Sequence, residues 1–289
     1  MPFKIAVASG KGGTGKTTIA INLFHYISKE LTPKIQMIDC DVEEPNDMLF
    51  FPNAKISSEQ SATQSIPTVD KSKCTYCRKC VDWCEFNAIV VIPLAGFAEV
   101  NTSLCHSCGA CSVACGFGAI SEKPEEIGTI RHYSIGQHGI ISEGRLKIGS
   151  AMQTLLIKQV KQQVLDDADI IIFDAPPGTS CPVVETVADA DYIILVTEPT
   201  PFGLYDLKLT VELVKDLGKP FGAVINKAGL GDHKVHDYLA EEHIEILGEI
   251  PFNREYASQY AKGDIFENIP GEIKAQYTSI FQKLLVKST

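Results

Sequence analysis

The sequence predicts an α/β fold in which helices flank a mainly parallel sheet and a small α+β domain is inserted into the chain. Three observations favour this fold. Short β-rich apolar runs alternate with segments of helical periodicity along the 289 residues, as in a parallel sheet with helical crossovers. A glycine-rich loop directly follows the first apolar run. About 130 residues separate the second apolar run from the third, far more than one crossover helix requires.

The alternating segments define the elements of the main domain. Strands are expected near residues 3–8, 35–39, 169–174, 192–197, 221–225 and 245–250. Helices are expected near residues 16–30, 151–166, 204–217, 233–242, 254–262 and 271–287. The last helix has an apolar stripe and few basic residues on its polar face, which favours packing in the core over binding to a membrane. If any internal segment is disordered, we expect it to be residues 52–68, which are mostly polar.

The glycine-rich loop has the spacing of a phosphate-binding loop placed between a strand and a helix. Its glycines let main-chain N–H groups turn inward around a phosphate, and the helix N-terminus adds partial positive charge. Lys16 is expected to reach the β- and γ-phosphate oxygens, and Thr17 to bind Mg²⁺. The predicted nucleotide-binding residues of the loop are Gly10, Lys11, Gly12, Gly13, Thr14, Gly15, Lys16, Thr17 and Thr18.

Lys11 is an additional lysine near the start of this loop, which reads KGGTGKT. With that lysine, the loop resembles the deviant Walker A motif of the MinD/ParA/Mrp class of P-loop ATPases. The resemblance implies ATP or ADP and Mg²⁺ as cofactors, and hydrolysis of ATP. It also implies a homodimer on ATP binding, in which Lys11 reaches the nucleotide of the other copy.

Later stretches of the sequence fit the same class in the same order. In KIQMIDCDVEEPN, Asp41 resembles the carboxylate that positions the attacking water, with Asp39 as the alternative. In DIIIFDAPPGTSCP, Asp174 resembles the Walker B acid that holds Mg²⁺, and Gly178 the switch glycine whose N–H senses the γ-phosphate. The positions that contact adenine in this class are matched by Asn226 and Pro251. The catalytic residues that the resemblance implies are therefore Lys11, Lys16, Asp41 and Asp174.

Eight of the ten cysteines fall in two runs with the same spacing, C-x₂-C-x₂-C-x₃-C. The first run holds Cys74, Cys77, Cys80 and Cys84, and the second holds Cys105, Cys108, Cys111 and Cys115. Each cysteine of the second run follows its counterpart by 31 residues, which indicates an internal duplication. The doubled pattern resembles the bacterial two-cluster ferredoxin.

The ferredoxin resemblance implies two 4Fe–4S clusters with crossed ligands. The fourth cysteine of each run ligates the other cluster in that pattern, so Cys84 would join the second triplet and Cys115 the first. Two zinc sites are the competing interpretation, but zinc ribbons usually pair their cysteines instead of repeating a triplet plus one. The sequence departs from the ferredoxin pattern at Glu85 and Gly116, where a proline normally follows the fourth cysteine. We expect the insert to fold as one unit with its iron.

These motifs divide the chain into two predicted domains. Residues 1–65 and 124–289 would form the discontinuous P-loop ATPase domain, and residues 66–123 the inserted ferredoxin-like domain. The two remaining cysteines are interpreted separately. Cys40 reads as a small buried thiol. Cys181 lies seven residues after Asp174, where the nitrogenase iron protein carries a ligand of an intersubunit cluster, but the absence of a clear second cysteine favours a plain thiol near the switch.

Composition excludes some classes of partner. The formal charge of −10 argues against nucleic acid or an anionic membrane, since both favour clustered Lys and Arg. The sequence has no apolar run long enough to span a bilayer, and its first residues do not resemble a signal peptide, so we predict a cytoplasmic protein. In that reducing compartment, metal explains the cysteine runs better than disulfides do.

Three functions fit these motifs. The leading hypothesis is an ATPase that couples nucleotide state to electron transfer through two clusters to an unidentified partner protein. The second is an Mrp-type carrier that assembles or delivers clusters, although crossed four-cysteine sites would hold a cluster tightly. The third is a MinD- or ParA-like positioning ATPase with structural clusters.

Overall fold

The protein, seen in a computed structural model that describes residues 2–30 and 34–287, divides into two compact units. Unit 1 takes the described residues of 1–59, 130–145 and 157–289, and unit 2 takes residues 60–129 and 146–156. Unit 2 is thus wider than the predicted insert of residues 66–123. The reason is that strands β3 (Lys55–Val69) and β6 (Ile120–Ile135) begin in one unit and end in the other. The expected boundaries therefore fall inside strands rather than in linkers.

A parallel sheet forms the centre of unit 1. Its strands are β1 (Phe3–Ala8), β2 (Ile35–Asp39), β8 (Ile170–Asp174), β9 (Tyr192–Thr197), β10 (Phe221–Ala228) and β11 (Ile246–Pro251). The full sheet has the order β11-β10-β9-β1-β8-β2-β7-β6-β3, where β7 spans Gly139–Leu146. All six predicted strands are confirmed, and every adjacent pair from β11 to β7 is parallel. Ligand groups at the ends of β1, β2 and β8 consequently share one edge of the sheet.

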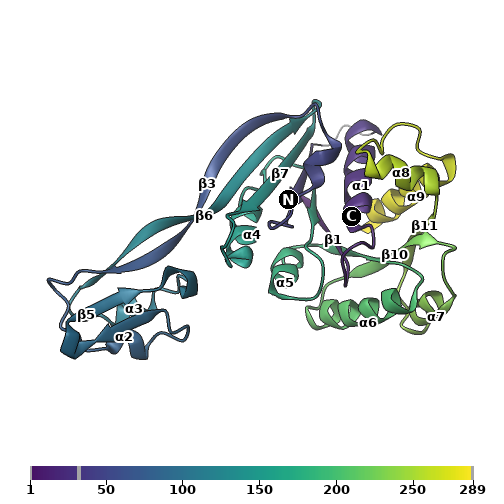
Figure 1. Cartoon of the computed structure of the whole chain (residues 1–289). Coiled ribbons are helices and arrows are strands. Elements are labelled where there is room, and N and C mark those ends of the chain that lie inside the picture. The colour runs from purple at the N-terminus through teal and green to yellow at the C-terminus, as the bar shows by residue number, and fades with distance from the viewer. Residues whose placement is uncertain (1, 31–33, 288–289) are drawn as a thin grey trace. The chain divides into compact units, whose positions relative to one another are not determined.

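Helices cover both faces of this sheet. They are α1 (Lys16–Glu30), α4 (Gln153–Lys161), α5 (Cys181–Val187), α6 (Pro201–Asp216), α7 (Lys234–Glu241), α8 (Arg254–Ala261) and α9 (Gly271–Lys287), with the short 3₁₀ helix η1 (Asp47–Phe50) after β2. Figure 1 shows α1, α8 and α9 on one side of the sheet and α5, α6 and α7 on the other. The expected helices are present, and α5 is one that the sequence did not predict.

The apolar stripe of α9 lies in the core. Its buried side chains pack in one cluster with α1 and the central strands, and they are Ile273, Tyr277, Ile280, Phe281 and Leu284. Core packing was the predicted role of this stripe, and the burial confirms it. Among the residues that the structure describes, none of the helices combines the length and hydropathy needed to cross a membrane.

The expectation of disorder at residues 52–68 is wrong. Residues 55–69 form β3, which pairs with β6 along the sheet. The strand is mostly exposed, and its buried positions alternate at Ala62, Gln64 and Ile66. A ladder of main-chain hydrogen bonds to β6 orders this segment, and its polar composition gives no sign of such a partner.

Unit 2 repeats one set of turns. It contains the antiparallel pair β4 (Ile89–Ile92) and β5 (Phe97–Val100), the short helices α2 (Lys79–Asp82) and α3 (Ala110–Ala114), and the 3₁₀ turns η2 (Pro93–Ala95) and η3 (Thr102–Leu104). Left-handed backbone conformations recur at a spacing of 31 residues, in the pairs Tyr76 and Ser107, Arg78 and Gly109, and Asn87 and Gly118. The duplication seen in the cysteines therefore extends to the local fold.

Candidate functional site

The phosphate-binding loop joins β1 to α1. Gly13 and Gly15 have φ values of 78° and 92°, a region that disfavours side chains with a Cβ. A Cβ on Gly15 would also lie 2.0 Å from Nδ2 of Asn226. Glycine is needed at this position for both reasons, so the loop can curl tightly before the helix begins at Lys16.

Asp174, at the end of β8, holds the two functional side chains of the first turn of α1. The Lys16 Nζ atom lies 3.2 Å from Asp174 Oδ1, and the Thr17 hydroxyl donates to Asp174 Oδ2 at 2.6 Å. Lys16 is 8% exposed and Asp174 1%. Burial alone would lower the pKa of Lys16, but the Asp174 carboxylate outweighs burial and raises that pKa. Lys16 therefore stays charged and suited to neutralise phosphate, while Thr17 and Asp174 offer oxygens to Mg²⁺.

Asp39 and Asp41 lie in different environments. Asp39 is 1% exposed and accepts hydrogen bonds from the main-chain N–H groups of Asp41, Asn46 and Asp47 at 2.9 to 3.2 Å. Asp41 is half-buried, and burial raises the pKa of its carboxyl. Asp39 thus shapes the turn after β2, whereas the Asp41 carboxyl keeps access to solvent. This contrast favours Asp41 for contact with a water, and the assignment stays a prediction.

Lys11 makes a contact that the sequence did not reveal. Its Nζ atom lies 2.7 Å from Glu198 Oε1, and Lys227 Nζ lies 2.9 Å from Glu198 Oε2 and 2.8 Å from the Gly13 carbonyl. The two ammonium groups outweigh burial and lower the pKa of Glu198. Glu198 follows β9 and is therefore distant from the loop in sequence. One carboxylate thus holds Lys11 within its own chain.

A pocket beside the loop is suited to a flat base. Asn226 and Pro251 line it, as predicted from the resemblance, together with aromatic residues that were not predicted, namely Phe252, Tyr256 and Tyr260. The Asn226 amide donates to the Thr14 carbonyl at 2.7 Å, so it is tied to the loop. Tyr256 donates to Asn22 at 3.0 Å. The segment EIPFNREY announced a polar loop, but only the fold brings its aromatic rings beside Gly15.

Gly178 has a left-handed φ of 100°, and its N–H donates to the Ser9 carbonyl at 3.1 Å. The predicted role as a sensor of the γ-phosphate requires this N–H to be free. The hydrogen bond to Ser9 must therefore open before Gly178 can bind a phosphate oxygen.

Unit 2 contains two cavities lined by four cysteines each. One is lined by Cys74, Cys77, Cys80 and Cys115, and the other by Cys84, Cys105, Cys108 and Cys111. Each run therefore shares its fourth cysteine with the opposite cavity. Main-chain N–H groups point at four of the sulfur atoms at 3.3 to 3.5 Å, those of Cys74, Cys84, Cys105 and Cys115. Such hydrogen bonds stabilise thiolates.

The sulfur spacing distinguishes between the two candidate metals. Thiolates bound at about 2.3 Å to one tetrahedral zinc ion lie about 3.8 Å apart. Among the described residues, which include all ten cysteines, no three Sγ atoms lie within 4.8 Å of one another. A four-iron cluster keeps its thiolates further apart than a single ion does. The donor sets thus fit 4Fe–4S clusters better than zinc.

The other two cysteines differ from each other. Cys40 is fully buried, and burial raises the pKa of its thiol, which fits an inert core residue. Cys181 is exposed at the first residue of α5. A role for Cys181 in an intersubunit cluster stays a prediction.

A model of the CobQ/CobB/MinD/ParA nucleotide binding domain matches residues 5–266. The chain belongs to this family. It is accordingly a MinD/ParA-like P-loop ATPase, with the loop, the Walker B acid and the base pocket at the positions described above. The match runs across the cysteine-containing segment without identifying it as a ferredoxin domain.

Relatives and solved structures agree with this membership. An uncharacterized protein of Methanocaldococcus jannaschii is 31% identical over 264 residues, which cover 91% of this chain and 90% of that protein. An iron-sulfur cluster carrier protein of Pyrococcus abyssi is 26% identical and is aligned over 87% of this chain and 74% of its own length. The Mg-ADP complex of MinD from Pyrococcus horikoshii superimposes with a TM-score of 0.60 at 16% identity, covering 100% of this chain and 99% of that one. That likeness confirms the mainly parallel α/β fold.

Proposed function

We propose that this chain hydrolyses ATP and couples its nucleotide state to electron transfer through two 4Fe–4S clusters to a partner protein. The observation that carries the proposal is the occurrence in one chain of a complete P-loop site and two cavities lined by four cysteines each. The covalent path between them is short. Strand β2 ends at Asp39, η1 follows, and β3 begins at Lys55 and ends five residues before Cys74.

The P-loop residues supply charge and position for phosphoryl transfer. Lys16 and Lys11 neutralise the γ-phosphate, and Thr17 and Asp174 would hold Mg²⁺, which screens the phosphate oxygens when it is bound. Asp41 orients the attacking water. Asn226, Pro251 and the aromatic rings beside them hold the base. Because Lys11 is bound to Glu198 in the nucleotide-free chain, we propose that ATP draws Lys11 away and towards a second copy of the chain.

The cysteines would hold the clusters in the crossed sets that line the two cavities. Cys74, Cys77, Cys80 and Cys115 form the first set, and Cys84, Cys105, Cys108 and Cys111 the second. Each bound cluster supplies one-electron redox chemistry. Because each run provides a ligand to both sets, loss of one cluster would loosen the other. A cytoplasmic location and partners other than nucleic acid or membrane remain predictions from composition.

Delivery of clusters is the second candidate function. It is favoured by the similarity to iron-sulfur cluster carrier proteins, and it would use the same ATPase. Closed sites of four cysteines count against it, because a carrier releases its cargo readily. A positioning ATPase with structural clusters is the third candidate, and the likeness to MinD supports only its fold.

Metal content tests the cluster assignment. Protein purified without oxygen is expected to contain about eight irons per chain and to show reducible cubane signals in electron paramagnetic resonance. The matched variant Lys16→Ala should lose ATP hydrolysis and keep these signals, since the lysine touches none of the cysteines. Two zinc ions per chain in place of iron would refute the assignment.

Coupling is tested by the reduction potentials of the clusters. We expect them, or the rate of electron transfer to an acceptor, to differ between ATP, ADP and a non-hydrolysable analogue, and to stop responding in Lys16→Ala. Values that do not depend on nucleotide would exclude coupling. Rapid ATP-dependent transfer of iron and sulfide to an apo-acceptor would instead support the carrier function.

A further inference from the structure

Asp47 is a buried acid that the P-loop mechanism does not use. It is the first residue of η1, and its side chain is 0% exposed. Within the described part of the chain, neither of its carboxylate oxygens has a hydrogen-bond partner. Burying an ionised carboxylate without a partner costs several kcal/mol. A group that is missing from this environment must therefore compensate for Asp47.

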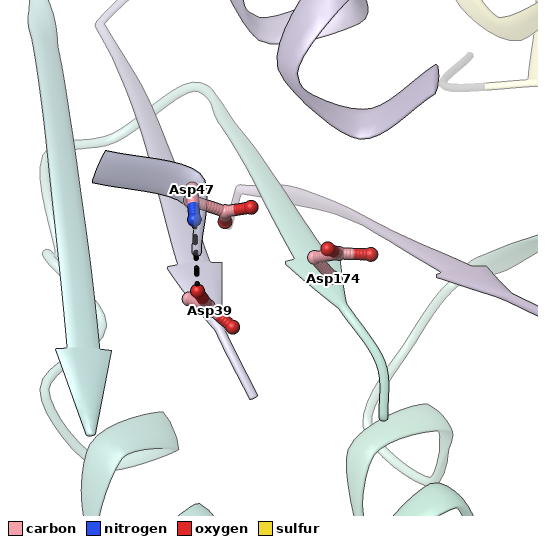
Figure 2. A group of neighbouring side chains, drawn as sticks. All are labelled: Asp39, Asp47 and Asp174. Carbon is pink, nitrogen blue, oxygen red and sulfur yellow. Dashed lines mark hydrogen bonds between the residues drawn. The ribbon is translucent and has the colours of Figure 1, made fainter. Parts of the chain in front are cut away.

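Two other acids face Asp47 from neighbouring strand ends. Asp39 ends β2 and Asp174 ends β8, and the two strands are paired at these residues. One oxygen from each of the three carboxylates lies within 4.8 Å of the others. Figure 2 shows the Asp47 carboxylate directed towards Asp174, with Asp39 below it and linked to its main-chain nitrogen. Three separate elements thus bring acid oxygens to one point.

The charges of this acidic cluster do not balance. Lys16 contacts Asp174 and brings one positive charge to three carboxylates, which leaves −2 when all three are ionised. Burial is the main cause that raises the pKa of Asp39 to about 8, and it also raises the pKa of Asp47. One divalent cation would cancel the excess.

The spacing admits such a cation. Oxygens bound to Mg²⁺ at about 2.1 Å lie about 3.0 Å apart when adjacent and about 4.2 Å apart when opposite. Ca²⁺ has longer bonds and a wider spacing. The limit of 4.8 Å within the cluster covers both, and a donor set made only of oxygen selects hard cations over zinc or copper.

We propose that Asp39, Asp47 and Asp174 hold a divalent cation of the Mg²⁺ kind before nucleotide binds. This site differs from an ordinary P-loop magnesium site, where the phosphates and the Thr17 hydroxyl bring the ion in together with the nucleotide. Asp47 adds a carboxylate that makes binding independent of phosphate. Because Asp47 begins η1, the cation also ties η1 to the end of β8.

Binding of Mn²⁺, used as a spectroscopic substitute for Mg²⁺, tests the proposal. The full chain with its clusters intact is freed of divalent ions and nucleotide, and free Mn²⁺ is followed by electron paramagnetic resonance during titration. We expect one Mn²⁺ per chain in this cluster, displaced by excess Mg²⁺. Asp47→Asn should weaken that binding at least about tenfold, the loss common when even an outer partner of a metal site is removed. Glu43→Gln removes an exposed acid nearby and should change nothing.

Thermal unfolding gives a second measure that also monitors folding. Mg²⁺ alone should raise the melting temperature of the wild type and of Glu43→Gln, but not that of Asp47→Asn. Without metal, Asp47→Asn should melt higher than the wild type, because it removes a buried like charge. The proposal is overturned when nucleotide-free wild type binds no Mn²⁺, when binding appears only after ADP is added, or when Asp47→Asn binds as tightly as the wild type.

Discussion

Glu198 holds Lys11 in the nucleotide-free chain, and this contact opposes the role proposed for Lys11 in a dimer. Glu198→Gln removes the negative charge and keeps the shape of the side chain. We predict that this variant forms the nucleotide-dependent dimer more readily than the wild type. The reason is that Lys11 no longer has to leave an ion pair of 2.7 Å before it reaches the other copy.

The size of the effect follows from exposure. At 2.7 Å the bare Coulomb attraction is about 6 kcal/mol at an effective dielectric constant of 20. Lys11 is 31% exposed and Glu198 13%, and partly exposed pairs retain at most about 1 kcal/mol. Two protomers each break one pair, so up to about 2 kcal/mol is recovered. That corresponds to a Kd for dimerisation lowered by up to about thirtyfold.

Sedimentation velocity over a range of protein concentrations, with a non-hydrolysable ATP analogue, measures this Kd. Glu212→Gln is the matched control, because it removes an exposed charge from α6, the helix that follows Glu198 in the chain. Nucleotide affinity should be measured in parallel, since Lys227 also loses its partner in the variant. An unchanged or weaker dimer at equal nucleotide occupancy would refute the idea that Glu198 restrains Lys11.

Three further predictions concern stability and the clusters. Gly15→Ala combines a left-handed φ with an atom 2.0 Å from its new Cβ, so urea unfolding should show a loss of about 2 to 3 kcal/mol. Cys84→Ser should alter the cluster signals of the second run, and Cys115→Ser those of the first, as seen by Mössbauer and paramagnetic resonance spectra; effects confined to each variant's own run would contradict crossed ligation. Burial lowers the pKa of His25 to about 4, so stability is complete above the ordinary value of about 6.5 and is lost as pH falls towards 4. His25→Phe, which keeps the stack on Phe266, should lessen that loss in melting curves; an unchanged pH profile would exclude the histidine as its cause.

Local patterns in the sequence were sufficient to predict the central fold. Buried parallel strands such as β8 and β9 are continuous apolar runs, and the helices between them have clear periodicity, so each segment declared its own structure. Strand β3 did not, because its exposed polar residues are held by pairing with β6 rather than by burial. Pairing between segments some 60 residues apart leaves little trace in composition.

The same distinction separates the site residues that were predicted from those that were missed. Lys16, Thr17 and Asp174 follow from motifs because each sits at a fixed offset in a strand end or loop. Glu198 and Asp47 were missed because their importance comes from what lies opposite them after folding. Asp47 had one weak signal, a polar run after β2 in which an acid follows Asp39 by eight residues, but only burial shows that this acid faces inward.

In the nucleotide-free chain, several groups that would bind nucleotide are bound to each other. Lys11 bonds to Glu198, Gly178 to the Ser9 carbonyl and Asn226 to the Thr14 carbonyl. Each such bond contributes about 0.5 to 1.5 kcal/mol, so nucleotide must replace several of them to gain its full set of contacts. ATP binding is therefore an exchange of partners that releases the segments after β8 and β9. A chain built in this way senses the γ-phosphate through the bonds that open, and the segment leading to the cysteines begins within ten residues of Asp47.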